Sequence, residues 1–261
     1  SICAATTDDV KKDPRPSAYA SSRSAKAELL GVETCIALAQ KTGARLHVVH
    51  LGVGDGAKAI RNAQAMGVRI SAETCPHYLA FTQEEDLEQL GGILKTAPVV
   101  KSSSDRDELW RAISDGAIEM IATDHAPGMW PEEKKTGNIW TDYGGVPGVE
   151  TMVPFLISEG VAKGRITLER AVSLLSSGPA RIHSIASRKG AIEVGLDADF
   201  MVLDPLHTWK VCAADLYTRQ KYTPFDGWLF RGKVIRTYVR GREVFDASRG
   251  IVASAAGQLV R

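Results

Sequence analysis

The strongest constraint on the fold is an alternation of strand-like and helix-like segments over the first half of the chain. Four short apolar segments alternate with amphipathic helical patterns, and this order is typical of βα units that build a parallel sheet. We predict strands at residues 44–52, 68–77, 92–98 and 117–124. We predict helices at residues 21–42, 54–67, 82–92 and 102–116.

The second half of the chain has a different texture. Residues 127–147 are rich in Gly, Pro, Trp and charge and predict a long loop, and loops of that length are often functional. Residues 148–187 have helical patterns, and the chain becomes strand-like from residue 190, with a hairpin within 233–246. We therefore predict an α/β domain at residues 1–188 and a β-rich domain at residues 189–261.

Composition excludes several classes of partner. The net charge is +1, which gives no electrostatic reason to bind nucleic acid or a membrane surface. No apolar run approaches the roughly 18 residues of a membrane span. The four cysteines are scattered without a C-x-x-C pair, as expected of reduced thiols. We expect a cytoplasmic protein that binds neither nucleic acid nor a membrane.

Ionisable residues fall at the carboxyl ends of three predicted strands. His50 shares a strand face with Leu46 and Val48, His77 ends the next strand, and Asp124 ends the last. The carboxyl ends of parallel strands meet at the edge where α/β barrels place their active sites. Two imidazoles and a carboxylate suit a Zn²⁺-type site, and the carboxylate can also move a proton. We predict His50, His77 and Asp124 as metal ligands.

For other polar residues near these strands, more than one role is possible. A single histidine at a strand end is more often a hydrogen-bonded structural residue than a ligand, and we expect His47 to be structural. His125 is predicted to orient its neighbours. Glu73 and Glu150 are compatible both with contacts to the metal ligands and with solvated or turn positions. Cys75 is predicted to be a small core residue.

Several motifs together resemble the cyclic amidohydrolases, the family of allantoinases, dihydroorotases and hydantoinases or dihydropyrimidinases. The motifs are "HVVHLG", "SAETCPHYL", "IATDHAPG" and "GGVPGVE", in that order. The later segments "GAIEVGLDADFMVLDP" and "VRGREVFD" resemble the small β-sandwich of that family. Within the family, "ELWRAISDG", "KTGNIW" and "GQLVR" are most similar to the allantoinase branch.

The resemblance implies a metal-dependent hydrolase on a distorted (β/α)8 barrel with two metal ions, usually zinc. His50 and His77 match ligands of one metal, and Asp124 matches the ligand of the other metal and the general acid/base. The implied reaction is attack of a metal-bound hydroxide on the ring amide of a small cyclic ureide, as in conversion of allantoin to allantoate. Substrate contacts would fall at Ala97 and at Gly144 or Gly145. A homo-oligomer is also implied.

The sequence departs from the family pattern in three ways. It has no H-x-H pair, no lysine at a strand end before His50, and four predicted βα units where a closed barrel needs eight. We therefore expect that this chain forms the second half of the barrel and the C-terminal part of the sandwich. We also expect that the chain alone is inactive. Ala97 lacks the family's polar side chain, which leaves dihydroorotase or dihydropyrimidinase activity open. A catalytically incomplete fragment or a non-catalytic scaffold relative is the remaining alternative.

Overall fold

The computed structural model describes residues 2–253 and 257–260, and the chain divides into two compact units. The first unit holds the residues up to Met152 together with Cys212–Asp226. The second holds Val153–Val211 and the chain from Gly227 onward. The predicted boundary at residue 188 lies inside the second unit, because the helices before it group with the C-terminal sheet.

The first unit is built on a parallel sheet in the order β1-β2-β3. This confirms the predicted α/β class. Its strands are β1 (Leu46–Val48), β2 (Ile70–Thr74) and β3 (Met120–Ile121). Its helices are α1 (Ile2–Val10), α2 (Pro16–Ser21), α3 (Ala25–Thr42), α4 (Gly54–Ala65), α5 (Pro76–Ala80), α6 (Leu87–Leu90), η1 (Gly91–Leu94), α7 (Ser103–Asp115) and η3 (Ala213–Asp215).

Local sequence signals set the ends of the two longest helices. The Ser24 side chain accepts a hydrogen bond from the Ala27 N–H at the start of α3, and Gly43 ends that helix with φ +68°. At the start of α7, Ser102 and Asp105 form a reciprocal capping box. Gly43 is the stop residue that the sequence predicts, whereas α3 begins at Ala25 and not at the predicted residue 21.

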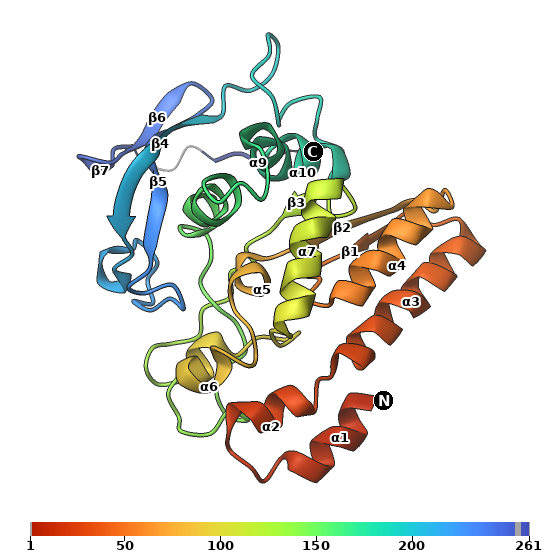
Figure 1. Cartoon of the computed structure of the whole chain (residues 1–261). Helices are drawn as coiled ribbons and strands as arrows, with labels where there is room; N and C mark the ends of the chain where they lie inside the picture. Colours follow the sequence, from red (N-terminus) through yellow and green to blue (C-terminus); the bar gives the residue numbers. More distant parts are fainter. Residues whose placement is uncertain (1, 254–256, 261) are drawn as a thin grey trace. The chain divides into compact units, whose positions relative to one another are not determined.

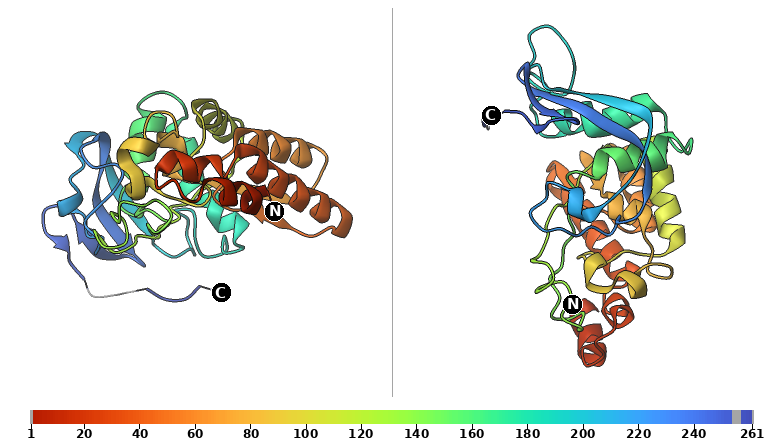
Figure 2. Two further views of the ribbon diagram at one scale, coloured as in Figure 1. Left: turned by 90° about the horizontal axis from the view of Figure 1, so that it is seen from below. Right: turned by 90° about the vertical axis from the view of Figure 1, so that its left-hand side faces the viewer.

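Helices α3, α4 and α7 lie side by side against the parallel sheet (Figures 1 and 2). The apolar face of α4 buries Ile60 and Ala63, and α7 buries Leu109 and Ile113. The core of the first unit lies between this helix layer and the strands, so it holds the carboxyl ends of the strands in place.

A core substitution tests this layer. We expect Leu109→Ala to lower the free energy of unfolding of the first unit by about 2–5 kcal/mol, because removal of the fully buried side chain leaves a cavity. Urea denaturation followed by tryptophan fluorescence measures the change. The matched control is Leu38→Ala on α3, where the leucine is 56% exposed and the expected change is within about 0.5 kcal/mol. Equal losses in both variants would contradict the packing described here.

The strand predicted at residues 92–98 is wrong. Residues 91–94 form the short helix η1, and β2 pairs directly with β3. The carbonyl groups after η1 accept hydrogen bonds from other segments. The Lys95 carbonyl accepts from the Gly145 N–H, and the Thr96 carbonyl accepts from the Tyr19 hydroxyl. The Pro98 carbonyl accepts from a third group, the Tyr78 hydroxyl. With its polar groups used this way, the segment forms no ladder with a strand.

The second unit combines short helices with an antiparallel sheet in the order β4-β5-β6-β7. Its elements are α8 (Met152–Phe155), η2 (Leu156–Val161), α9 (Leu168–Leu175), α10 (Ser177–Ile182), β4 (Phe200–Lys210), β5 (Leu229–Val239), β6 (Arg242–Asp246) and β7 (Gly250–Ile251). The long strands β4 and β5 run side by side in Figure 2. The β5–β6 turn at Arg240 and Gly241, both with positive φ, confirms the predicted hairpin.

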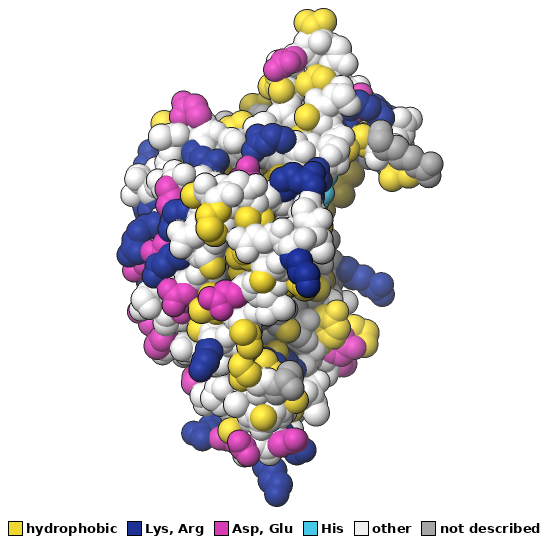
Figure 3. Space-filling view, turned by 90° about the vertical axis from the view of Figure 1, so that its right-hand side faces the viewer, with side chains coloured by type: hydrophobic (Ala, Val, Ile, Leu, Met, Phe, Trp, Pro, Cys, Tyr) yellow, Lys and Arg dark blue, Asp and Glu magenta, His cyan; other side chains and the backbone are white. Residues whose placement is uncertain are grey.

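Surface composition matches the near-zero net charge. On the face drawn in Figure 3, acidic and basic side chains are interspersed rather than gathered by sign. Among the described residues, no helix combines the length and apolar character that crossing a membrane requires.

Candidate metal centre at the end of the parallel sheet

Two predicted ligands have unusual backbone conformations. His50 has φ +39° and Asp124 has φ +46°. Among the described residues, the only other non-glycine positions with positive φ are Ser184 and Arg240. Left-handed backbone is uncommon for such residues and often marks turns or functional sites. Both conformations occur two or three residues beyond a strand, where the chain leaves the sheet and redirects its side chain.

His77 lies in a different setting from the predicted one. It is the second residue of α5, three positions beyond β2, and not a strand-end residue. Pro76 occupies the first helical position, where its missing N–H is not needed, so it starts the helix directly after Cys75. The His77 side chain is 1% exposed, and its ring lies 4.1 Å from the Tyr78 ring between centroids. Its position at the carboxyl end of β2 is retained.

Hydrogen bonds align the three strand ends. The Thr74 hydroxyl donates to the Leu51 carbonyl at 2.7 Å, and the Leu51 N–H donates to the Glu73 carbonyl at 2.9 Å. On the other side of β2, the Ala122 N–H donates to the Thr74 carbonyl at 3.0 Å. The chain segments that carry His50 and Asp124 therefore leave the sheet on either side of the end of β2.

Two imidazole nitrogens at this edge are buried without a hydrogen-bond partner: His50 Nδ1 and His77 Nε2. Burial, with a smaller effect of His50, lowers the pKa of His77 to about 3, so this imidazole is neutral and has a free lone pair. A buried polar atom without a partner is destabilising unless a ligand satisfies it. Neutral imidazole nitrogen is a common metal ligand. The donor set of this edge therefore fits a transition-metal ion.

The Asp124 carboxylate lies near the residues that flank His77. Burial raises the pKa of the Cys75 thiol, and Asp124 and then Glu73 raise it further. Burial also raises the pKa of Tyr78, with Asp124 among the smaller contributors. Within residues 2–253 and 257–260, no group of three or more His, Cys, Asp or Glu side chains is arranged to hold a metal ion. The three predicted ligands thus share an edge without forming a closed cluster.

The other polar residues near the predicted strand ends have defined hydrogen-bond partners. His47 Nδ1 lies 2.8 Å from the Ser71 hydroxyl, and His47 Nε2 lies 3.2 Å from Glu73. The Glu150 carboxylate accepts from the Tyr217 and Thr218 N–H groups, which is a structural contact.

His125 and Cys75 also have structural surroundings. His125 Nδ1 accepts from the N–H groups of Gly148 at 3.1 Å and Val149 at 3.3 Å, so it orients the loop beyond. Cys75 is fully buried, as predicted for a core residue.

The predicted substrate-contact positions lie on two connected segments. Ala97 and Gly144 are exposed, whereas Gly145 is buried. The Gly145 N–H donates to the Lys95 carbonyl at 2.8 Å, which places the 144–145 backbone beside the segment that leads to Ala97. A side chain at Gly145 would clash with the Ala126 carbonyl. The loop therefore runs close to the chain that follows Asp124.

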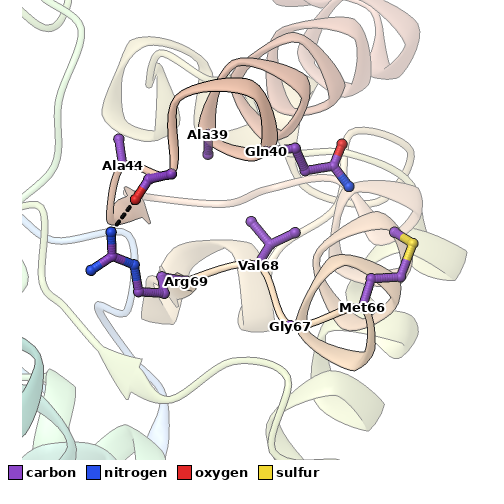
Figure 4. A pocket seen from close by; sticks show the side chains of 8 residues that line it. Ala39, Gln40, Ala44, Met66, Gly67, Val68 and Arg69 are labelled. Carbon is purple, nitrogen blue, oxygen red and sulfur yellow. Dashed lines mark hydrogen bonds between the residues drawn. The ribbon is translucent and has the colours of Figure 1, made fainter.

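Two cavities of the first unit differ in their relation to this edge. One of about 310 Å³ is lined by residues just before β1 and β2, including Ala44, Val68 and Arg69, and the Arg69 guanidinium donates to the Gly43 carbonyl (Figure 4). It lies at the amino ends of the strands. The other, of about 250 Å³, has His50 in its lining. Only the second adjoins a predicted ligand.

A buried lysine next to this region was not singled out by the sequence pattern. Lys134 is 1% exposed, and its ammonium donates to the carbonyls of Tyr143 at 2.8 Å and Gly145 at 2.7 Å. Burial lowers its pKa to about 7; Asp142 opposes this shift and Lys95 adds to it. The only sequence signal is a lysine within the charged run "PEEKKTG", which is typical of solvated surface.

The lowered pKa predicts a pH dependence of stability. Between about pH 7 and 10.5 the unfolded chain binds more protons at Lys134 than the folded protein does. The free energy of unfolding therefore rises with pH, by up to about 1.4 kcal/mol per pH unit from this group. Urea denaturation from pH 7 to 9 should give a steeper rise for the wild type than for Lys134→Met. The control Lys135→Met, at an exposed neighbour, should keep the wild-type slope, and equal slopes in all three proteins would contradict the shift.

Comparison with known proteins places the chain in a family. The sequence profile described as "Amidohydrolase family" matches residues 21–244. An allantoinase from Rubrobacter xylanophilus is 37% identical over 244 residues, 93% of this chain and 53% of the relative. An L-hydantoinase from Paenarthrobacter aurescens is 35% identical over 245 residues, with the same two coverages.

Solved structures agree with this placement. An L-hydantoinase (dihydropyrimidinase) from Arthrobacter aurescens has a TM-score of 0.91 at 33% identity, over 96% of this chain and 56% of the other. A D-hydantoinase (dihydropyrimidinase) from Thermus sp. has a TM-score of 0.94 at 26% identity, over 100% of this chain and 58% of the other. The chain spans about half the length of the curated relatives that it matches. On sequence and structure together, this chain belongs to the amidohydrolase family.

Proposed function

We propose that this chain carries one part of the active site of a hydrolase that opens a cyclic amide, with allantoin as the substrate. The observation that carries the proposal is the pair of buried, unpartnered imidazole nitrogens of His50 and His77 at the edge that also holds Asp124. The 37% identity to an allantoinase supports the choice of allantoin.

The parallel sheet supports a larger architecture for the complete protein. We propose that residues 1–188 form the second half of a closed (β/α)8 barrel and that residues 189–261 contribute to a β-sandwich. In the order β1-β2-β3, β1 is an edge strand, and a barrel closes only when every edge is paired. The remaining strands and metal ligands would come from another segment of the complete protein, and the 261-residue chain alone would be inactive. Self-association of the complete protein is part of the proposal.

His50, His77 and Asp124 are the residues that would hold metal, with zinc as the first candidate. A bound metal supplies Lewis-acid activation of water and polarisation of the amide carbonyl. His77 presents a neutral imidazole at a fixed position, because α5 buries it completely. The Asp124 carboxylate accepts a proton from the attacking water and returns it to the leaving ring nitrogen. Its left-handed backbone lies where the chain leaves β3.

Substrate recognition would rely on backbone groups. Ala97 offers only its main chain, and the exposed Gly144 likewise presents amide and carbonyl groups without a side chain. The N–H and carbonyl of the buried Gly145 are bonded to Lys95 and Lys134, so Gly145 would act by fixing the backbone of Gly144. Backbone donors and acceptors match the alternating N–H and C=O groups of a cyclic ureide. The exposed position of Ala97 and Gly144 is compatible with this role. A hydantoin ring is the second candidate substrate, because an L-hydantoinase is 35% identical over 93% of this chain.

A substrate panel tests the proposal. The complete protein would be purified with its metal content measured by elemental analysis, and then assayed on allantoin, hydantoin, dihydrouracil and dihydroorotate. We expect the highest kcat/KM on allantoin, about two zinc ions per chain as in two-metal hydrolases, and loss of activity with a chelator that zinc restores. Preference for another ring would assign a different branch. A metal-replete protein that hydrolyses none of the four rings would favour the non-catalytic alternative.

A further inference from the structure

Two lysine ammonium groups are buried beneath the loop segment Trp140–Gly145, in the first unit. Lys134 is 1% exposed and Lys95 is 7% exposed. Buried lysines are rare, because an ammonium group removed from water must find replacement acceptors for its protons. Neither lysine is among the metal-ligand or substrate-contact residues proposed above. Their burial therefore calls for a separate explanation.

Both ammonium groups bind backbone carbonyls of the same segment. Lys134 Nζ donates to the carbonyls of Tyr143 at 2.8 Å and Gly145 at 2.7 Å. Lys95 Nζ donates to the carbonyl of Asp142 at 2.5 Å and, at 3.5 Å, to that of Trp140. Four carbonyls within six residues thus accept hydrogen bonds from the side-chain nitrogens of only two lysines. We call Lys95 and Lys134 the two-lysine clasp.

The surroundings of the clasp balance its charge. The Asp142 carboxylate, 7% exposed, accepts from the N–H and the hydroxyl of Thr136, both at 2.9 Å. The Tyr222 ring lies 5.7 Å from Lys134 Nζ, and the Tyr19 ring lies 5.0 Å from Lys95 Nζ, within cation–π range. Asp142 raises the pKa of both lysines, against the stronger effect of burial.

Close packing leaves little freedom for the clasped segment. A Cβ at Gly92 would clash with the Lys134 carbonyl and with the Asp142 carboxylate. The backbone of η1 therefore lies directly against the clasp, and only glycine fits there. The two lysine side chains therefore contact a closely packed segment rather than a solvent-exposed loop.

A short path of backbone contacts joins the clasp to Asp124. The Gly145 N–H donates to the Lys95 carbonyl at 2.8 Å, and the Gly145 backbone packs against the Ala126 carbonyl. The Ala126 N–H in turn donates to the Val146 carbonyl at 3.0 Å. Ala126 is two residues beyond Asp124, whose positive φ must be held by its surroundings.

We propose that Lys95 and Lys134 are positioning residues that hold the Trp140–Val146 backbone against the chain following Asp124. In this way they set both the Asp124 carboxylate and the Gly144–Gly145 backbone. The proposal extends the proposed function to two lysines outside the metal centre. Its structural part does not depend on which reaction the complete protein catalyses.

Amide hydrogen exchange on the complete protein tests the structural part and needs no substrate. In Lys134→Met, which keeps the length of the side chain but removes the ammonium, we expect peptides containing Ala126 and Gly145 to exchange at least about 10-fold faster. Peptides from α4 should exchange at the wild-type rate. The matched control Lys135→Met changes the exposed neighbour and should leave all peptides unchanged. Unchanged protection at Ala126 and Gly145 in a folded Lys134→Met protein would overturn the proposal.

A second variant and a kinetic readout separate positioning from loss of fold. If Lys134→Met does not fold, Lys95→Met carries the same exchange test. In the complete protein, the folded variant should retain its metal content. Its kcat should fall and its KM should rise, each at least several-fold, because both Asp124 and the Gly144–Gly145 backbone shift. A kcat that falls only in proportion to the fraction of folded protein, with unchanged KM, would overturn the positioning role. If the wild type hydrolyses no ring, the proposed function fails while the exchange result still decides on the clasp.

Discussion

Asp124→Asn in the complete protein should lower the turnover of its cyclic amide by about 10²–10⁴-fold, the usual contribution of a positioned general acid/base. The carboxamide has nearly the shape of the carboxylate but cannot take up and release a proton at neutral pH. Asparagine also tolerates the left-handed backbone that Asp124 adopts at φ +46°. The variant should therefore keep the fold, and steady-state kinetics measures the loss.

The matched control for this prediction is Asp107→Asn on α7. Asp107 is exposed and pairs with Arg106 at 3.4 Å on the surface, so its replacement removes a carboxylate without touching the sheet edge. We expect wild-type kinetics in this control. Metal content and hydrogen exchange, measured on the same samples, show whether a loss in Asp124→Asn comes from proton transfer or from a lost metal. Wild-type turnover in Asp124→Asn would rule out its assigned role.

His50→Asn should lower the metal affinity of the complete protein by more than about 100-fold. Loss of a residue that only orients a ligand already lowers affinity about 10–100-fold, and loss of the ligand itself should exceed that. Asparagine again accommodates the positive φ, here +39°. Elemental analysis after dialysis against a weak chelator, followed by titration with zinc, measures the change.

The same strand provides the control. His47→Asn removes an imidazole of β1 whose two ring nitrogens contact Ser71 and Glu73. Because both nitrogens already have protein partners, we expect wild-type zinc content in this variant. Equal metal loss in His47→Asn and His50→Asn would mean that β1 has been disturbed as a whole. Unchanged zinc in His50→Asn would remove His50 from the metal site.

Features that depend on neighbours in the chain were predictable from the sequence. The alternating patterns predicted the parallel class of β1 and β2, because side-chain periodicity follows directly from helix and strand geometry. The Gly43 stop of α3 and the Arg240–Gly241 hairpin turn are also local. For the same reason, the apolar runs that precede His50 and Asp124 were enough to place both residues near the carboxyl ends of strands. The structure has them two and three residues beyond β1 and β3, and not in the strands as predicted.

Features that depend on distant segments could not be predicted in this way. The segment 92–98 has the composition of a strand, but its carbonyls bind the Tyr19 hydroxyl, the Tyr78 hydroxyl and the Gly145 N–H, which lie elsewhere in the sequence. The two-lysine clasp has no sequence signature, because a lysine that binds backbone carbonyls has the same local sequence as a surface lysine until the chain folds over it. Periodicity reports which side of an element is buried, whereas the partner that satisfies each buried polar group is chosen by tertiary contacts.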